Sequence, residues 1–432
     1  MKILDLISKF FNVYKRGSSV RKEVVAGIGM FLTISYAVVV CAYILSAAGM
    51  PRDKVLIAAC LTSAIGTIVS GFFSRIPITM APGMGLCLFF TYVMVMGQHM
   101  KWETALGAVF ISGVLFFILS VAGLRDMIMK SLPAAIIDAA SGGIGLYIAI
   151  TGLKEMKLSV ADPNAIISAS CLLQETYIGL AALLLIVVLE VFRVRGAILF
   201  GIIFAAVSGY IFHITAAPAQ IMSMNFSIAP LFLKLDIAGA LKVGFMGSIL
   251  TLMFIDMFDG YETPDICSTK LELDSQEREE ALKPLLATDA GTTIFGSLMG
   301  VSTTTSCMES VKGIEDGGRT GLASIVAGLL LLILIPFHPF LASIPGYALA
   351  PAYIIIGLIL MSRIRNIDYS SVEAGFPAFI TILIMPSTSS ISIGLAAGFT
   401  AHLIIKLVRR KFADLNPVLI LVTLLLLIGV IV

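Results

Sequence analysis

Long apolar runs separated by short polar stretches repeat along almost the whole chain. Most of these runs approach the roughly 20 residues that a helix needs to cross the hydrocarbon core of a bilayer. The pattern predicts transmembrane segments at 24–46, 55–73, 76–97, 103–123, 132–153, 176–192 and 197–214, and, after a polar break, at 240–262, 284–300, 301–315, 320–337, 343–361, 374–388 and 389–407. The last apolar stretch, 417–432, is shorter and fits a full span, a half-span or an interfacial helix.

Composition strengthens this interpretation. Hydrophobic residues make up 58% of the 432 residues and charged residues 13%, about half the roughly 25% typical of soluble domains. The chain is therefore predicted to be a polytopic all-α membrane protein. Its net charge of +2 gives no reason to expect nucleic acid as a partner, since Lys and Arg occur in short loops. The cysteines fall mostly inside apolar runs, which favours small buried residues over a disulfide framework or a metal site.

The predicted segments fall into two groups of seven, and in each group the third segment is interrupted. Pro82, Gly83 and Gly85 break the segment around Ala81–Leu86, and the hydroxyl run from Ser302 to Ser306 weakens the other one. Paired interrupted segments at corresponding positions in two halves indicate a transporter whose binding site lies near the membrane midplane. The sequence thus predicts a 7+7 inverted repeat in which segments 3 and 10 are interrupted.

The positive charges predict the orientation. Most of the 29 Lys and Arg lie on one side of the predicted membrane, and the exceptions are Arg52, Lys54, Lys101, Lys154, Lys157, Lys234 and Lys242. The side richer in Lys and Arg is expected to be cytoplasmic. This bias predicts a cytoplasmic N-terminus and an even number of spans, which argues against a full crossing by 417–432. Residues 1–22 are expected to form a cytoplasmic interfacial segment.

Two acids lie in apolar stretches that also contain helix-breaking or hydroxyl-rich sequence. Asp259 is in Phe254–Asp265 and Glu309 is in Gly300–Ser310. A charge at membrane depth costs about 3 kcal/mol on insertion scales, so each acid is a functional-site hypothesis. The breaks beside them are expected to open the helices and line a cavity.

Several motifs, taken in order, resemble one family over nearly the whole chain: the AzgA-like purine permeases of the nucleobase–ascorbate (NCS2) transporters. The motifs include Phe31–Tyr36, Ala81–Leu86, Gly143–Lys154, Gly317–Leu322 and Phe376–Pro386. The resemblance implies proton-coupled uptake of purine bases such as adenine, guanine or hypoxanthine. It also implies fourteen segments arranged in a core domain and a gate domain.

The implied domain boundaries follow the predicted segments. Core segments 1–4 lie at 24–123, gate segments 5–7 at 132–214, core segments 8–10 at 240–315, core segment 11 at 320–337, gate segments 12–14 at 343–407, and the C-terminal hydrophobic segment at 417–432. The family's two key acids correspond to Asp259 and Glu309. The chain departs from the family pattern at five positions: Gly260 replaces a threonine, Glu262 a glycine, Cys87 an asparagine, and Cys41-Ala42 an Asn-Pro pair.

The candidate residues suit a flat, neutral base. The Glu309 carboxylate is expected to accept an N–H of the base, a charge-assisted bond. Backbone N–H groups near Thr305 and Ser306 are expected to bond its carbonyls, and Gly83 and Gly85 to let it approach the backbone. Cys87 is included because it occupies the family's asparagine position. Phe89 and Tyr261 are candidate stacking surfaces, although packing in the core or against lipid is the alternative for Phe89.

Proton coupling is assigned to Asp259, Glu309 and Glu262. Burial disfavours the ionised form of a carboxylate, and protonation removes the cost of moving a charge through an apolar interior. Asp256, Asp259 and Glu262 recur every three residues and share one helix face. The alternative for Glu262 is a solvated position at the cytoplasmic end of the helix.

The remaining expectations concern the class of protein and its surroundings. No metalloprotease or intramembrane acid-protease motif is found, and no filter-like loops repeat, which argues against an enzyme and a channel. No cofactor or metal is expected, and the proton is the coupling ion. The partners expected are a nucleobase, the bilayer of a bacterial cytoplasmic (inner) membrane, and a second copy bound through the gate domain. The same fold carrying another small planar or anionic solute remains the alternative.

Overall fold

The computed structural model describes residues 8–123, 133–162, 165–169, 173–388, 390–411 and 416–431. Its longer helices are α2 (Val20–Ala47), α3 (Arg52–Ser74), α5 (Trp102–Val121), α7 (Ala134–Glu155), α8 (Gln174–Val191), α9 (Ala197–Ile211), α11 (Met246–Lys270), α12 (Ser275–Met299), α14 (Gly321–Leu334), α16 (Gly346–Met361), α17 (Val372–Thr388), α18 (Ile391–Val408) and α19 (Pro417–Ile431). The shorter elements are α4 (Met84–Leu88), α10 (Ile237–Ala240), α13 (Ser310–Glu315), α15 (His338–Ala342), the π-helix η1 (Phe89–Gly97), the 3-10 helices η2 (Val243–Phe245), η3 (Ile335–Phe337) and η4 (Ser362–Asn366), and the strands β1 (Met80–Pro82), β2 (Ser159–Asp162), β3 (Ala165–Ala169) and β4 (Thr304–Ser306).

Among the described residues, eight helical stretches are long and apolar enough to cross a membrane. They begin at Val20, Arg52, Trp102, Ala134, Gln174, Gly321, Gly346 and Ile391. The prediction of a helical, polytopic membrane fold is therefore confirmed, with four short strands in addition, and the count of fourteen segments stays a prediction. Shorter apolar helices, including α9, α17 and α19, occupy other predicted spans.

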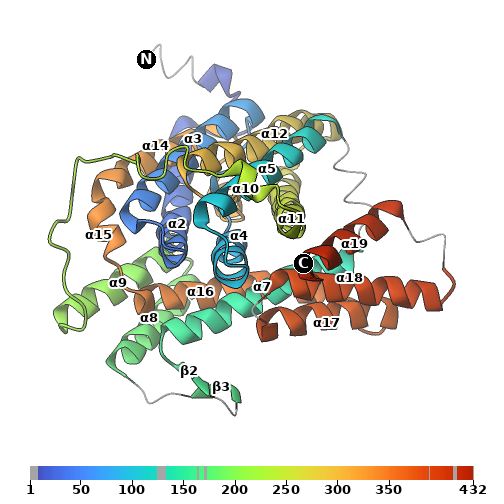
Figure 1. Cartoon of the computed structure of the whole chain (residues 1–432). Coiled ribbons are helices and arrows are strands. Elements are labelled where there is room, and N and C mark those ends of the chain that lie inside the picture. The colour runs from blue at the N-terminus through green and yellow to red at the C-terminus, as the bar shows by residue number, and fades with distance from the viewer. Residues whose placement is uncertain are drawn as a thin grey trace.

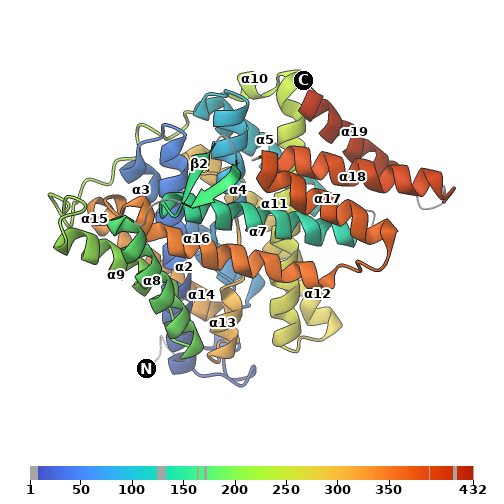
Figure 2. The same ribbon diagram turned by 90° about the horizontal axis from the view of Figure 1, so that it is seen from below.

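The helices form two layers (Figure 1). In one layer α14 packs against α2 and α3, and α12 packs against α3 and α5. In the other layer α7 packs against α16 and α17, α17 against α18, and α8 against α9. Seen from below, α7, α16, α17 and α18 cross the helices of the first layer at a steep angle (Figure 2). We refer to these as the first and second layers. They contain most of the predicted core and gate segments, whose assignment as domains stays a prediction.

Small residues allow this close packing within each layer. A Cβ at Gly321 on α14 would lie 1.9 Å from the carbonyl oxygen of Gly71 on α3. A Cβ at Gly145 on α7 would lie 2.7 Å from the carbonyl oxygen of Gly357 on α16. Helices inside a membrane associate through such close backbone approaches, because lipid is as apolar as the side chains and no hydrophobic effect drives the helices together.

The two interrupted segments meet where the layers face each other. Strands β1 and β4 pair antiparallel, with Met80 opposite Ser306, Ala81 opposite Thr305 and Pro82 opposite Thr304. Each strand is followed by a short helix, α4 after β1 and α13 after β4. The pairing supplies hydrogen bonds to backbone that has left the helical conformation, which membrane depth requires. The predicted interruption of segments 3 and 10 is confirmed.

Two expectations about elements are wrong or need new boundaries, and a third element has an unexpected helix type. The stretch around Asp259 does not open, because α11 continues through Gly260 and Pro264 to Lys270. Helix α12 begins at Ser275, well before 284, with a capping box formed by Asp274 and Glu277. The predicted segment 76–97 continues beyond α4 as the π-helix η1.

The regions outside the predicted spans add two features. Strands β2 and β3 pair antiparallel between α7 and α8, and the sequence pattern did not predict them. Helix α19 packs against α18 and α11. Its 15 residues give a length of about 22 Å, less than the roughly 30 Å hydrocarbon core. Of the predicted interfacial segment 1–22, residues 1–7 lie outside the described part.

Candidate functional site

A cavity of about 350 Å³ lies between the two layers, beside the β1–β4 pair. Its size falls within the range of about 300–1,000 Å³ typical of small-molecule sites. The first layer and its interrupted segments contribute Tyr36, Gly83, Gly85, Asp259, Thr263, Thr305, Ser306 and Glu309, among others. The second layer contributes Ser141 and Ile144 from α7, Ile356, Ile359 and Leu360 from α16, and Ser362, Arg363, Arg365 and Asn366 from η4.

Glu309 lies at the N-terminal end of α13, directly after the strand–turn that follows β4. The hydroxyl of Tyr36, on α2, donates a hydrogen bond to the Glu309 Oε1 atom. Tyr36 is itself buried, with 3% of its surface exposed, so its hydroxyl holds the carboxylate at the cavity wall. A hydrogen bond to a charged acceptor is among the stronger ones in proteins. Tyr36 therefore positions the acid that the sequence identified.

Asp259 reaches the same cavity from the continuous helix α11. One helical turn later, the hydroxyl of Thr263 donates to the carbonyl oxygen of Ser306 at 3.2 Å. This bond ties the Asp259 turn of α11 to β4, which leads into the Glu309 turn. The two acids predicted from the sequence therefore face one space, supported by a common framework.

Asp289 on α12 supports that framework from behind. It is fully buried, and its Oδ1 atom accepts the backbone N–H of Ser306 at 2.9 Å. A Cβ at Gly260 would lie 1.8 Å from the other carboxylate oxygen of Asp289. The glycine that replaces the family's threonine is thus the residue that lets this carboxylate reach β4.

The backbone of β4 was expected to offer N–H groups to a ligand, and much of that expectation is wrong. Asp289 accepts the Ser306 N–H, and the carbonyl of Thr79 accepts the Cys307 N–H at 2.9 Å. The N–H of Thr304 donates to the Thr293 hydroxyl at 3.3 Å. These groups stabilise the strand itself, since buried backbone donors require partners. Among the described residues, the Thr305 hydroxyl has no hydrogen-bond partner, and Thr305 lines the cavity.

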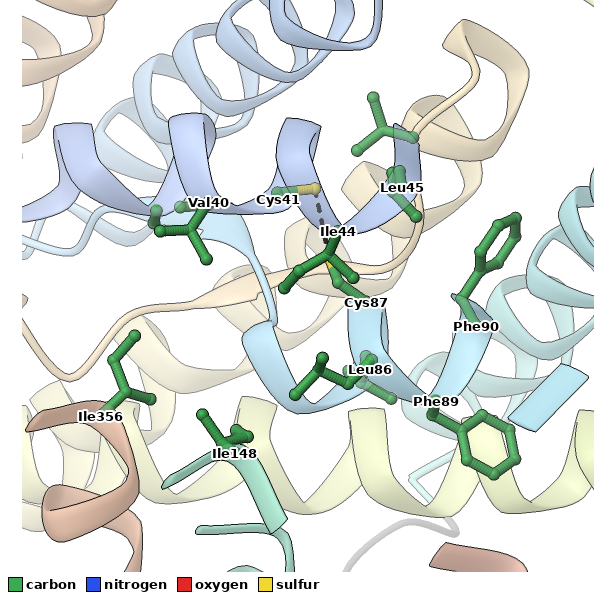
Figure 3. Close-up of a cluster of buried hydrophobic side chains, with 14 of the residues drawn as sticks. Val40, Cys41, Ile44, Leu45, Leu86, Cys87, Phe89, Phe90, Ile148 and Ile356 are labelled. Atoms are coloured by element: carbon green, nitrogen blue, oxygen red, sulfur yellow. Dashed lines mark hydrogen bonds between the residues drawn. The ribbon is translucent and has the colours of Figure 1, made fainter. Parts of the chain in front are cut away.

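Of the candidate binding residues, Glu309, Asp259, Thr305, Ser306, Gly83 and Gly85 line the cavity. Cys87 and Phe89 do not line it, and both are fully buried. Figure 3 shows a cluster of buried apolar side chains in which Phe89 and Phe90 lie on the opposite side from Ile356. Ile356 borders the cavity. Packing, the alternative reading for Phe89, is what the structure supports. The side chains of Tyr261 and Glu262 lie outside the described part of the chain.

Two of the departures from the family pattern come into contact. The Sγ atom of Cys87 on α4 lies 3.2 Å from the Sγ atom of Cys41 on α2 (Figure 3). Both cysteines are buried, and both are free thiols. Cys41 on α2 and Cys87 on α4 therefore meet at one contact, and neither residue lines the cavity.

The sequence interpretation missed the residues that close the cavity from the second layer. Ser141 lies within the glycine-rich stretch of α7 next to the Gly143–Lys154 motif, and Arg363 follows α16 on η4. Arg363 was assigned to the cytoplasmic positive charges, and its place in a loop-like sequence gave no sign of a cavity. Tyr36 is the last residue of the Phe31–Tyr36 family motif, and that position was the sequence signal that could have identified it. Within the described residues, no group of three His, Cys, Asp or Glu side chains is placed to hold a metal ion.

The architecture has counterparts among solved structures. The transmembrane domain of the cyanobacterial bicarbonate transporter BicA superposes with a TM-score of 0.66 at 15% identity, covering 88% of this chain and 97% of that one. SLC26A9 gives a TM-score of 0.65 at 11% identity, covering 88% of this chain and 64% of that one. This fold contains a 7+7 inverted repeat. These structures give the fold, and the family to which the chain belongs makes it a membrane transporter, not an enzyme.

Sequence comparison gives the family. The model described as "Permease family" (Xan_ur_permease) matches residues 21–397, so the chain belongs to this family of nucleobase–ascorbate (NCS2) transporters. Similar proteins include a putative permease, MJ0326, of Methanocaldococcus jannaschii, 39% identical over 96% of this chain and 95% of that protein. Adenine permease AdeP of Escherichia coli is 31% identical (97% and 95% covered), and guanine/hypoxanthine permease PbuG of Bacillus subtilis is 32% identical (95% and 96%).

Proposed function

We propose that the protein imports purine nucleobases by proton symport, with the base bound in the cavity between the layers. The observation that carries the proposal is the convergence of Glu309, fixed by Tyr36, and Asp259 on one cavity beside the β1–β4 pair. Relatives that match about 95% of the chain are named as adenine permeases and guanine/hypoxanthine permeases, which supports a purine as the cargo.

In this proposal Glu309 binds the base and Asp259 carries the proton. The Glu309 carboxylate accepts a ring N–H or an exocyclic amine, and the hydroxyl of Thr305 supplies a further polar contact. Asp259 lines the cavity from α11, and a bound proton neutralises its carboxylate. When Asp259 is protonated, the loaded first layer carries one negative charge fewer as it moves past the second layer through the apolar interior.

The finer expectations about setting belong to the same proposal. The protein lies in the cytoplasmic membrane with its N-terminus inside, as the Lys and Arg distribution favours. Two copies associate through the second layer, leaving the first layer to move. Labelling of single cysteines placed at Lys9 and at Lys101 by a membrane-impermeant reagent tests the orientation. Labelling of Lys9→Cys in intact cells contradicts it.

Uptake measurements test the cargo and the coupling. Cells that lack their own purine permeases and express the protein should accumulate radiolabelled hypoxanthine, guanine or adenine, and a proton uncoupler should abolish accumulation. If none of these bases is taken up above the background of cells carrying an empty vector, the purine proposal fails, and other small planar or anionic solutes become the candidates.

Substitutions separate the two acids. Glu309→Gln should abolish binding of the base, whereas Asp259→Asn should retain exchange of labelled for unlabelled base and lose uphill uptake. Asp265→Asn is the matched control, because Asp265 lies on the same helix but pairs with Arg278 at the surface. Normal accumulation by Asp259→Asn would remove Asp259 from the proton path.

A further inference from the structure

The cavity has opposite hydrogen-bonding character on its two sides. The first layer presents the carboxylates of Asp259 and Glu309, which accept hydrogen bonds when ionised. The second layer presents the guanidinium groups of Arg363 and Arg365, which only donate. The backbone N–H groups of Thr304 and Ser306 are already used within the protein. The charged donors for a ligand therefore come from the second layer.

Arg363 is the better placed of the two arginines. Its Nη1 atom donates to the hydroxyl of Ser141 on α7 at 3.2 Å. This bond holds the guanidinium against α7, and both residues line the cavity. Its charge interacts with that of Asp259 on the facing layer and with that of Asp138 on α7. Arg365, two residues later, is exposed and makes no comparable hydrogen bond within the described residues.

The segment that carries Arg363 is held firmly. A Cβ at Gly142 would lie 2.4 Å from the side chain of Ile364, so η4 sits directly on the α7 backbone. Ile367, just after η4, is buried in a cluster with Ala139 and Ala378. A guanidinium on such an anchored turn presents its donors in a fixed geometry, which favours planar, two-point recognition over loose charge attraction.

We infer that Arg363 selects 6-oxopurines, guanine and hypoxanthine, over adenine by donating to the carbonyl oxygen at C6 and to N7 of the base. This inference rests on the proposed function. An arginine fork spans these two acceptors, as it does on guanine in nucleic acids. The opposite edge of guanine and hypoxanthine carries the N1–H, and guanine adds an amine, so that edge suits Glu309. Adenine places an amine toward the arginine and an unprotonated N1 toward the acid, and mismatches both sides.

The same reasoning ranks the remaining base. Xanthine keeps the C6 carbonyl and N7 but replaces the guanine amine by a second carbonyl, which would face the Glu309 carboxylate. The expected order of affinity is guanine, then hypoxanthine, with xanthine and adenine weaker. Family membership does not supply this order, because relatives of comparable identity are named for adenine and for guanine/hypoxanthine.

Competition experiments test the inference in the full-length protein without altering it. In cells that lack their own purine permeases, unlabelled guanine and hypoxanthine should inhibit radiolabelled hypoxanthine uptake at concentrations at least about tenfold lower than adenine does, the ratio expected from one hydrogen bond to a charged group. 7-Deazahypoxanthine, which lacks the N7 acceptor, should be a weaker inhibitor than hypoxanthine. Equal inhibition by adenine and hypoxanthine would overturn the inference and leave purine transport standing.

Variants then assign the selectivity to the fork. Arg363→Gln should raise the hypoxanthine KM by roughly 5- to 150-fold, the range of a bidentate contact to a base edge, and change adenine inhibition far less. Arg363→Lys keeps the charge but loses the fork, so it should also lose selectivity. Arg409→Gln is the matched control and should keep the wild-type ratio, because Arg409 pairs with Glu373 and does not line the cavity.

Two results would count against the assignment. If Arg363→Gln reduces the uptake of every purine by the same factor, Arg363 has a structural role between the layers and does not distinguish one base from another. If the wild type takes up no purine at all, the proposed function fails and the inference fails with it. Surface expression of each variant, measured by a C-terminal tag, ensures that lost uptake is not lost protein.

Discussion

Gly260 should tolerate no larger side chain while Asp289 keeps its position. A Cβ placed on Gly260 meets Asp289 Oδ2 at 1.8 Å and Asp289 Cγ at 3.1 Å. In Gly260→Ala the carboxylate therefore has to withdraw by roughly 1.2 Å, because Cβ atoms essentially never approach a neighbour closer than 3.0 Å. Asp289 lies on α12 and Gly260 on α11, so the alternative is to separate two packed helices.

The magnitude follows from the bond that Asp289 makes. Its Oδ1 atom accepts the Ser306 N–H at 2.9 Å, and a shift of that size takes the pair out of hydrogen-bonding range. Hydrogen bonds to charged groups contribute about 1.5–3 kcal/mol. We expect Gly260→Ala to lose stability of this order and to lower substrate affinity by roughly tenfold or more, since each 1.4 kcal/mol is a factor of ten and β4 forms part of the cavity wall.

The assay compares two alanine substitutions in neighbouring helices. Gly291→Ala is the control, because a Cβ at Gly291 meets nothing within 4 Å and alanine raises helix propensity by about 1 kcal/mol. Apparent unfolding temperature in detergent, measured at one fixed heating rate, should fall for Gly260→Ala and hold or rise for Gly291→Ala. Labelled hypoxanthine uptake reports the effect on the cavity.

A double-mutant cycle decides whether the clash is the cause. Asp289→Ala removes both the clash and the Ser306 bond, so adding Gly260→Ala to it should cost little more. Such non-additivity is the signature of two residues acting through one contact. Strictly additive losses, or a Gly260→Ala variant as stable as Gly291→Ala, would refute the reasoning.

Three further perturbations give measurable outcomes. Tyr36→Phe should weaken substrate binding about tenfold or more through loss of the bond to Glu309, with little change in unfolding temperature; unchanged affinity in equilibrium binding would contradict it. Gly321→Ala should cost about 1–3 kcal/mol of stability by forcing α14 away from the α3 backbone, seen as a lower unfolding temperature, and an unchanged temperature would disprove that contact. Lys312 on α13 pairs with Glu190 on α8 at 2.9 Å across the two layers. Because exposed pairs contribute about 0.2–1 kcal/mol, reversing either charge should change the uptake rate by less than about fivefold, and reversing both should restore it. Additive losses in the double variant would rule out the pairing.

The apolar pattern predicted most of the fold because membrane helices are constrained by length and composition. The ends of α3 and α5, for example, agree with the predicted spans within a few residues. The same reasoning failed at α11. Gly260 and Pro264 suggested a break in the helix. Pro264 has no N–H, so the only helical hydrogen bond it removes is the one to the carbonyl of Gly260, four residues earlier. Packing against β4 and α12 keeps the helix continuous despite this loss and the low helix propensity of glycine.

The two acids of the cavity could be predicted because a carboxylate in an apolar run is costly wherever it lies. Their partners could not. Tyr36 is an ordinary aromatic residue in an apolar helix until the fold brings it to Glu309, and Arg363 is an ordinary loop cation until η4 packs on α7. The matched contact of Cys41 and Cys87 is likewise a property of tertiary proximity, which single-sequence patterns do not contain.

The β1–β4 pair also determines the order in which the protein becomes complete. Strand β1 emerges from the ribosome long before β4, and at membrane depth its backbone groups have no water to bond. Until the second half has been inserted, the first half therefore carries a region of unmet backbone hydrogen bonding. We therefore expect a chain truncated before Thr304 to leave β1 without its pairing partner and to lack a complete cavity wall.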